Sequence, residues 1–322
     1  MRASNPRPEH LPTRYPVVLV NGFDVSPLFR YAPRITDMME SIGGHQVFLA
    51  IDTPYAPPQR RARDLWERVR SIRSQTGAEK VNLVCHSLGG LDCRFLVSPA
   101  GLHWEVDAAH TEIVESVASI TTIGTAHRGT RVADAALGAI PEAEAEEALN
   151  RLADSIGEGF AGEPLDGVDL RASLAAISTS EALAFNAQIL DAEGVYYQSW
   201  AGFSAPAGRV EAGYLETLHE WCRADDGSDG LEHFFGVHDY LALPLIPSAD
   251  LAGTVDGQEA FVPNDGLVPV SATHWGVFRG CIPADHMEQL GQRNIPDVNV
   301  RTGFDVARFY TNLAGDLSRR GF

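Results

Sequence analysis

The segment 81–91 constrains the fold more than any other part of the sequence. An apolar strand over 80–84 ends in a sharp turn centred on Ser87, and Gly89 leaves that turn free of a side chain two positions later. A helical pattern begins at once, with apolar residues at Leu88, Leu91 and Phe95. A strand, a tight turn and a helix in this order form a nucleophile elbow, which exposes the serine hydroxyl at the carboxyl edge of a sheet. The alternative is an ordinary strand-to-helix turn.

The first half of the chain alternates short apolar runs with helical patterns, as βαβ units do. Apolar residues at helical spacing predict a helix over 62–74, and a similar pattern predicts a closing helix over 306–317. The fold class expected is therefore α/β, with a mostly parallel central sheet and helices on both faces. The runs that read as buried strands are 17–20, 46–50, 80–84 and 117–123.

The length of 322 residues suits one large α/β domain over 1–322. An acidic run leads into an amphipathic pattern over 141–160, which predicts a helical lid or cap insertion spanning 133–190. An ordinary surface helix is the alternative there. Residues 204–230 are rich in Gly, Ala and Asp, so we expect an irregular excursion within the domain over 204–250.

Charge and apolar run length exclude several classes of partner. The chain has 25 Lys and Arg against 43 Asp and Glu, a net charge of −18 that repels nucleic-acid phosphates. Its apolar runs are much shorter than the roughly 18 residues that a membrane-spanning helix needs. We therefore expect no nucleic-acid partner and no transmembrane segment.

The four cysteines are too few for a disulfide scaffold and lack the spacing of a zinc or redox site. Cys222 and Cys281 could pair, and the sequence leaves this open.

A serine nucleophile needs a histidine base, and the base needs an orienting carboxylate. Asp265 lies in an Asn-Asp-Gly turn after an apolar run, and His286 lies in a polar loop farther along. The order Ser, Asp, His is the one expected after a nucleophile elbow. His274, beside Trp275, reads as a packed residue instead. Taken alone, Asp265 also fits the role of a simple turn residue.

Backbone N–H groups must also stabilise the oxyanion that forms during acyl transfer. The strand over 17–20 is followed by Gly22, which allows a sharp turn that points the Phe23 N–H inward. Leu88, directly after the serine, would supply the second N–H. The alternative for the first loop is a turn that only ends a strand.

Further stretches extend the pattern along most of the chain. They are residues 15–23, 44–48, 76–84, 120–129 and 264–268, with weaker ones at 180–186 and 194–202. In these stretches, and in this order, the sequence resembles the bacterial family I triacylglycerol lipases of the Pseudomonas, Burkholderia and Proteus type. Such colinearity is more specific than any single motif.

The resemblance implies an α/β-hydrolase fold, a helical lid, and cleavage of lipid esters at an oil–water interface through an acyl-serine. It implies that Ser87 is the nucleophile, Asp265 the triad acid and His286 the general base, and that Phe23 and Leu88 are the oxyanion donors. The family's His-Arg-Gly segment matches His127 and Arg128, which we interpret as supports of the site.

The compartment is open at the sequence level. The family is typically secreted, so the resemblance implies secretion, but the first ten residues lack the apolar stretch of an export signal. A cytoplasmic location is the alternative.

The chemistry itself requires no cofactor, but the resemblance implies a structural Ca²⁺ beside the catalytic histidine. The acid two residues after that histidine is Glu288, and the amide six residues after it is Gln292. Both are oxygen donors that a hard cation accepts. An upstream aspartate would complete the set, and Asp239 and Asp250 are the candidates.

Three positions depart from the family pattern: Asn21 stands where the family generally has His, Cys85 replaces the first glycine of the elbow, and Ala126 replaces a proline. None removes a reacting group, but each could change the substrate range. A short-chain carboxylesterase or polyester hydrolase is therefore the nearest alternative. A non-catalytic binding protein of the same fold is a further one, although such a protein has no need of an ordered triad.

Overall fold

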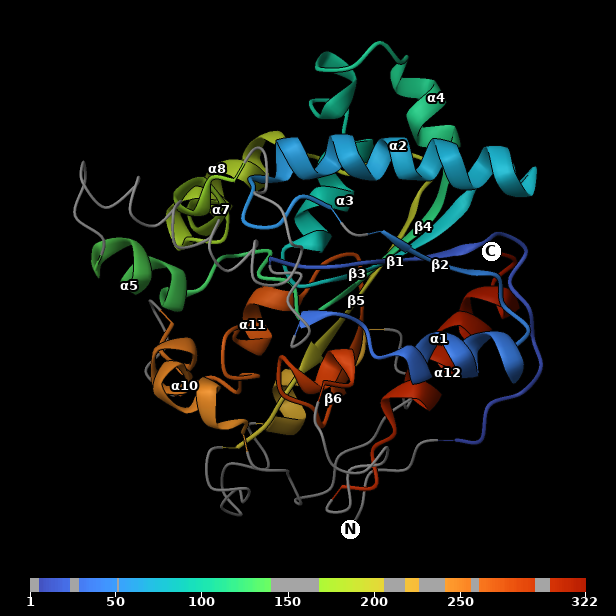
Figure 1. Ribbon diagram of the computed structural model, residues 1–322. Helices are drawn as coiled ribbons and strands as arrows, with labels where there is room; N and C mark the ends of the chain where they lie inside the picture. Colours follow the sequence, from blue (N-terminus) through green and yellow to red (C-terminus); the bar gives the residue numbers. More distant parts are fainter. Residues whose placement is uncertain are drawn as a thin grey trace.

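A computed structural model describes residues 6–23, 29–50, 52–139, 168–205, 218–225, 241–255, 261–292 and 302–322. Within these residues, six strands form one sheet in the order β2-β1-β3-β4-β5-β6, and every neighbouring pair is parallel (Figure 1). The strands are β1 (Val17–Val20), β2 (Val47–Ala50), β3 (Val81–His86), β4 (Val117–Ile123), β5 (Tyr196–Gly202) and β6 (Val277–Ile282).

The strand order reverses at β1, because β2 pairs with one edge of β1 and β3 with the other. In an open parallel sheet, such a reversal opens a crevice at the carboxyl ends of two neighbouring strands, which here are β1 and β3. The register pairs Val20 of β1 with Cys85 of β3, so the loops that follow both strands start side by side. These two loops carry the predicted oxyanion donor Phe23 and the predicted nucleophile Ser87.

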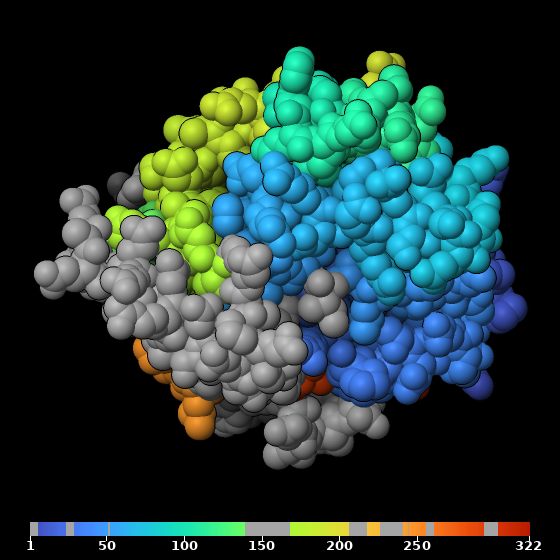
Figure 2. All heavy atoms as spheres, turned by 45° about the horizontal axis from the view of Figure 1, so that its top comes forward, coloured from blue at the N-terminus to red at the C-terminus, as the bar shows by residue number. Residues whose placement is uncertain are grey.

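Helices cover both faces of the sheet (Figure 1). On one face lie α1 (Pro33–Ser41) and α12 (Val306–Arg319); on the other lie α2 (Pro58–Thr76), α3 (Gly89–Val97) and α4 (His110–Glu115). Figure 2 brings this second face forward and shows α2 crossing it in blue, with the green segment around α4 beside it. The predicted α/β class is confirmed, and the described sheet is parallel throughout.

Shorter helices lie beyond the carboxyl ends of the strands (Figure 1). They are α5 (Arg131–Ala139), α7 (Leu170–Ala176), α8 (Thr179–Gln188), α10 (Ile246–Gly253) and α11 (Val270–Thr273). Short 3₁₀ turns are η2 (Leu102–Trp104), η3 (Leu243–Leu245) and η4 (Glu288–Leu290).

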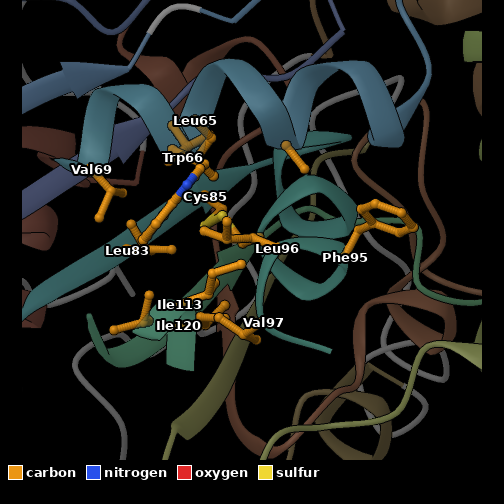
Figure 3. Packing of buried hydrophobic residues seen from close by; sticks show 14 of the residues in the cluster. Leu65, Trp66, Val69, Leu83, Cys85, Phe95, Leu96, Val97, Ile113 and Ile120 are labelled. Carbon is orange, nitrogen blue, oxygen red and sulfur yellow. A yellow bond between two sulfur atoms is a disulfide. The ribbon is translucent and has the colours of Figure 1, made fainter. Parts of the chain in front are cut away.

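The apolar face of α2 explains why this helix packs on the sheet. Leu65, Trp66 and Val69 recur at helical spacing and pack with Leu83 of β3 in one buried cluster (Figure 3). The helix is longer than the predicted 62–74, because Pro58 starts it one turn earlier and Gly77 ends it in the left-handed region at φ 70°.

The opposite face is closed by α12, as the sequence predicts. The Asp305 side chain caps this helix by accepting hydrogen bonds from the N–H groups of Ala307 and Arg308. Phe309 is fully buried, and its ring meets Trp200 of β5 edge-on at 5.1 Å between centroids. The C-terminal helix therefore anchors the sheet next to β5.

The prediction of a buried strand over 46–50 is wrong in one respect. β2 lies at the edge of the sheet, and only Ala50 of its four residues is buried. Leu49 is 37% exposed. By contrast, β1, β3 and β4 are buried along their whole length, because neighbouring strands and helices cover them.

The amphipathic helix predicted over 141–160 lies outside the described residues, as do 140–167 of the 133–190 insertion. Residues 206–217 and 226–240 of the predicted excursion over 204–250 lie outside them too. The single domain, the lid and the excursion remain predictions. None of the described helices is long and apolar enough to cross a membrane.

Both pairs of cysteines form disulfides. Cys222 pairs with Cys281, the pairing that the sequence left open, and Cys85 pairs with Cys93. The second pair was not predicted. It forms because the elbow turns α3 back over β3, so the cysteine of the strand meets one on the helix.

The packing of α12 yields a first test. Phe309→Ala removes a fully buried ring, so we expect a loss of about 3–5 kcal/mol in the free energy of unfolding. The matched control on the same helix is Arg308→Ala. The Arg308 side chain is 43% exposed and forms a surface ion pair with Asp305, so its removal should cost less than about 1 kcal/mol. Urea unfolding measures both, and equal losses would contradict this account of how α12 packs on the sheet.

Candidate active site

The turn after β3 has the geometry of a nucleophile elbow. Ser87 has a φ of 54°, in the left-handed region that residues other than glycine rarely adopt, and α3 begins two residues later. Its N–H donates to the Ile123 carbonyl at 3.0 Å, which ties the turn to β4. The strained backbone lifts the hydroxyl above the end of the sheet.

Two glycines allow the elbow and the loop after β1 to touch. A Cβ on Gly22 would lie 2.7 Å from the Ser87 Cβ, and a Cβ on Gly89 would lie 2.6 Å from the Asn21 carbonyl oxygen. Both distances are shorter than real contacts, so the approach requires glycine at both positions.

The structure brings the three predicted reacting side chains together. His286 Nε2 lies 2.9 Å from Ser87 Oγ, and His286 Nδ1 lies 2.7 Å from Asp265 Oδ2. His286 is 2% exposed and Asp265 is fully buried. An imidazole held between a hydroxyl and a buried carboxylate can take the hydroxyl proton.

The Asn-Asp-Gly turn fixes the Asp265 carboxylate. Its Oδ1 accepts the N–H groups of Leu267 at 3.1 Å and Val268 at 2.8 Å, while the Asn264 side chain accepts the Gly266 N–H. Asp265 thus serves as a turn residue and as a partner of His286, and the two interpretations of this turn are compatible.

A further side chain that the sequence analysis missed, Gln289, also binds this carboxylate. Its Nε2 donates to Asp265 Oδ2 at 2.8 Å, and the residue is fully buried. It fits a slot at the ends of β4 and β5: a Cβ on Gly124 or on Gly202 would lie within 2.3 Å of its amide group. In the sequence, the only feature that points to Gln289 is its position, one helical turn after His286.

His86 lies beside His286, and the centroids of the two rings are 4.6 Å apart. Burial lowers the pKa of His86 well below its usual range, and the neighbouring His286 lowers it further. A neutral His86 adds no positive charge next to His286, which must itself become positive when it accepts a proton.

The predicted oxyanion donors are unengaged. Within the described part of the chain, the N–H groups of Phe23 and Leu88 donate no hydrogen bond. Asn21, where the family generally has His, donates from its side chain to the Phe29 carbonyl at 2.7 Å. This bond fixes one end of the loop that carries Phe23.

A buried arginine supports the same loop, and the sequence analysis missed it too. Arg61 of α2 is fully buried; it donates to the Asn21 carbonyl at 2.7 Å and pairs with Asp92 of α3 at 2.7 Å. Burial raises the pKa of Asp92 to about 6, against the effect of the Arg61 charge, which lowers it. Asp52 lies 3.9 Å from Arg61 as a second buried carboxyl group.

A cavity of about 290 Å³ reaches Ser87 and His286. Its lining is mainly apolar and comes from the loop after β1, from α5, from α7 and from the turn after Asp265. The lining includes Phe23, Tyr55, Ala133, Leu174, Ile177 and Leu267. A cavity of this kind accepts an apolar chain next to the serine.

Two further histidines, His127 and His274, have partners away from the Ser87 hydroxyl. His127 is fully buried between Thr122 Oγ1 at 3.0 Å and Arg94 at 3.3 Å, and burial lowers its pKa well below the usual range. Arg128 donates to the His274 carbonyl at 2.6 Å. The His274 ring stacks on Phe278 at 3.7 Å, as expected of a packed residue.

The residues predicted to bind calcium do not form a complete set of ligands in the part of the chain that the structure describes. Glu288 is buried and accepts the Asp285 N–H at 3.1 Å, and the Gln292 side chain donates to the Arg30 carbonyl. Asp239 lies outside the described residues, and Asp250 is exposed on α10. No group of three His, Cys, Asp or Glu that could hold a metal occurs among the described residues. These donors do not fit a cation by themselves, so calcium stays a prediction.

Comparisons with known sequences extend the resemblance. No family model matches the chain. A triacylglycerol lipase of Vibrio cholerae is 29% identical, covering 86% of this chain and 80% of the relative. Triacylglycerol lipases of Pseudomonas fragi and Burkholderia plantarii are each 26% identical, covering 86% and 93% of this chain and 88% and 86% of the relatives.

Solved structures confirm the fold. The Staphylococcus hyicus lipase superposes with a TM-score of 0.62 at 16% identity, over 98% of both chains. Lipase 1 from Pelosinus fermentans superposes with a TM-score of 0.57 at 16% identity, over 95% of this chain and 99% of that one. The α/β-hydrolase fold and the resemblance to bacterial triacylglycerol lipases are therefore confirmed.

The buried arginine gives a test of how the loop is supported. Arg61→Leu leaves Asp92 and Asp52 buried without their cation, so we expect a loss of about 3–5 kcal/mol in the free energy of unfolding. The neighbouring Arg60 is the matched control. Its side chain is 43% exposed, so Arg60→Leu should cost less than about 1 kcal/mol. Urea unfolding decides, and a small loss for Arg61→Leu would contradict the assigned role.

Proposed function

We propose that this chain, a carboxylic ester hydrolase similar in sequence to bacterial triacylglycerol lipases, hydrolyses triacylglycerols through an acyl-serine intermediate on Ser87. The observation that carries the proposal is the hydrogen-bonded series from Ser87 through His286 to Asp265, at the mouth of an apolar cavity. The relatives named triacylglycerol lipase support the substrate class.

In the proposed first step, Ser87 Oγ attacks the ester carbonyl carbon while His286 Nε2 takes the hydroxyl proton. Asp265 accepts the hydrogen bond from His286 Nδ1, which keeps the proton on that nitrogen and leaves Nε2 free to act as the base. The carboxylate also stabilises the imidazolium that forms.

The tetrahedral intermediate carries a negative oxygen, which the N–H groups of Phe23 and Leu88 would stabilise by about 3 kcal/mol each. As the intermediate collapses, the bond between the carbonyl carbon and the alcohol oxygen breaks, His286 donates its proton to that oxygen, and the diacylglycerol leaves. Water attacks the acyl-serine by the same route, with His286 again as the base, and releases the fatty acid. No cofactor takes part in these steps.

The apolar cavity supports a long acyl chain as the substrate. Each buried CH₂ group contributes about 0.8 kcal/mol to binding, so a cavity of about 290 Å³ favours chains that fill it. Action at an oil–water interface and secretion belong to the same proposal. Two disulfides support secretion, because such bonds persist in oxidising compartments outside the cytosol.

The central role of Ser87 gives the next prediction. Ser87→Ala should reduce ester hydrolysis at least a thousandfold while the melting temperature stays unchanged, because only the nucleophile is lost. Ser271→Ala, at a partly exposed serine of α11, is the control and should keep full activity. Initial rates on p-nitrophenyl butyrate measure both. Activity of Ser87→Ala within tenfold of the wild type would contradict the assignment.

Labelling with a fluorophosphonate separates the enzyme from a non-catalytic binding protein. The wild type should become labelled on Ser87, and a chain that takes no label would support the binding-protein reading.

The substrate class is tested on α5. Ala133 is buried and lines the cavity, whereas Ala135 on the same helix is exposed. Ala133→Phe should therefore lower the rate on a long-chain triacylglycerol emulsion at least tenfold more than on a short-chain one, and Ala135→Phe should change neither. If the wild type hydrolyses only the short-chain substrate, the protein is an esterase or polyester hydrolase.

A further inference from the structure

Tyr55 has a backbone conformation that the catalytic steps above do not explain. Among the described residues, only Ser87 and Tyr55 combine a side chain larger than hydrogen with a positive φ, at 54° and 52°. The elbow accounts for Ser87. A bulky residue in the left-handed region is strained, and such strain persists only where the surroundings hold it in place.

On one side, Tyr55 contacts the loop after β1 that carries Phe23, called here the oxyanion loop. Its N–H donates to the Phe23 carbonyl at 3.0 Å, and its ring meets the Phe23 ring edge-on at 5.4 Å between centroids. The Tyr55 side chain is 7% exposed and lines the same cavity as Ser87. Tyr55 therefore fixes both the carbonyl and the side chain of Phe23, whose N–H is the proposed oxyanion donor.

The other side of Tyr55 holds α7. The Tyr55 carbonyl accepts the N–H of Asp169 at 2.8 Å, and Asp169 is the N-cap of α7, where its side chain accepts the Ala172 N–H at 2.8 Å. Farther along, Leu174 and Ile177 reach the cavity. A single strained residue thus joins the oxyanion loop to a helix that contacts the cavity.

We propose that Tyr55 is a positioning residue that makes the oxyanion donor at Phe23 dependent on the docking of α7. This inference rests on the proposed ester hydrolysis. With α7 docked, the hydrogen bonds on both sides of Tyr55 hold its left-handed backbone. If the start of α7 withdraws, Tyr55 relaxes to a negative φ, releases the Phe23 carbonyl, and the donor leaves its place. An acyl chain that packs on Leu174 and Ile177 keeps α7 docked and so favours the active arrangement.

The backbone requirement is tested by two substitutions that both remove the ring. Glycine adopts a positive φ without strain, whereas a β-branched valine strongly resists it. We expect Tyr55→Val to have a kcat on p-nitrophenyl butyrate at least tenfold below that of Tyr55→Gly, with similar KM for the two variants. Assays run well below each variant's melting temperature, so the difference reflects the site and not the folded fraction. Equal kcat values, or a difference in KM alone, would overturn the proposal.

The link to α7 is tested by a double-mutant cycle. Asp169→Ala removes the cap of α7 and should lower kcat about threefold in the wild-type background. In the Tyr55→Gly background it should change kcat by less than about 1.5-fold, because glycine adopts the left-handed backbone without strain and so needs no contact with α7 to hold it there. Ser178→Ala removes the corresponding cap of α8 and is the control, with no change expected in the wild-type background.

Two results would overturn the coupling: the same factor for Asp169→Ala in both backgrounds, or no effect in the wild type. Wild-type chain without ester hydrolysis would instead refute the proposed function, and this inference with it, before any Tyr55 variant is compared.

Discussion

The close approach of two backbones at the carboxyl ends of β1 and β3 is the constraint on which the rest of the site depends. The strand order reverses there, so the loop with Phe23 and the elbow with Ser87 share one crevice. Glycines at 22 and 89 permit the contact, because a Cβ at either position would lie within 2.7 Å of the opposite strand's loop. Arg61 then fixes the loop from below by binding the Asn21 carbonyl.

This arrangement places rigid dipoles around the reacting atoms before any substrate binds. Asp265 is held by its own turn and by Gln289, and His286 is held by Asp265. The carbonyl of Phe23, the proposed oxyanion donor, accepts the Tyr55 N–H, and the Tyr55 carbonyl accepts the Asp169 N–H at the start of α7. Preorganised groups of this kind need little rearrangement during the reaction, which is the main source of electrostatic catalysis. The contacts from Phe23 through Tyr55 to α7 also connect the proposed oxyanion site to a helix that lines the cavity.

The sequence was sufficient for features whose cause is local. The elbow around Ser87, the turn at Asp265 and the loop at His286 follow from short patterns, and their order along the chain assigns the partners. Arg61, Gln289 and Tyr55 could not be found in this way, because each acquires its role from contacts distant in sequence. Arg61 reads as a solvated charge on a helix until Asp92, 31 residues later, is brought against it. The buried-strand expectation for β2 failed for the same reason: apolar composition does not reveal which strand lies at an edge.

The central claim is that an acyl group passes through Ser87, and trapping that intermediate tests it most directly. The protein is mixed with excess p-nitrophenyl butyrate, quenched in acid within the first turnover, digested, and analysed by mass spectrometry. The account predicts a butyryl adduct on Ser87, formed together with the first equivalent of p-nitrophenol. Release of p-nitrophenol with the adduct on another residue, or with no adduct on Ser87 at any quench time, would contradict it.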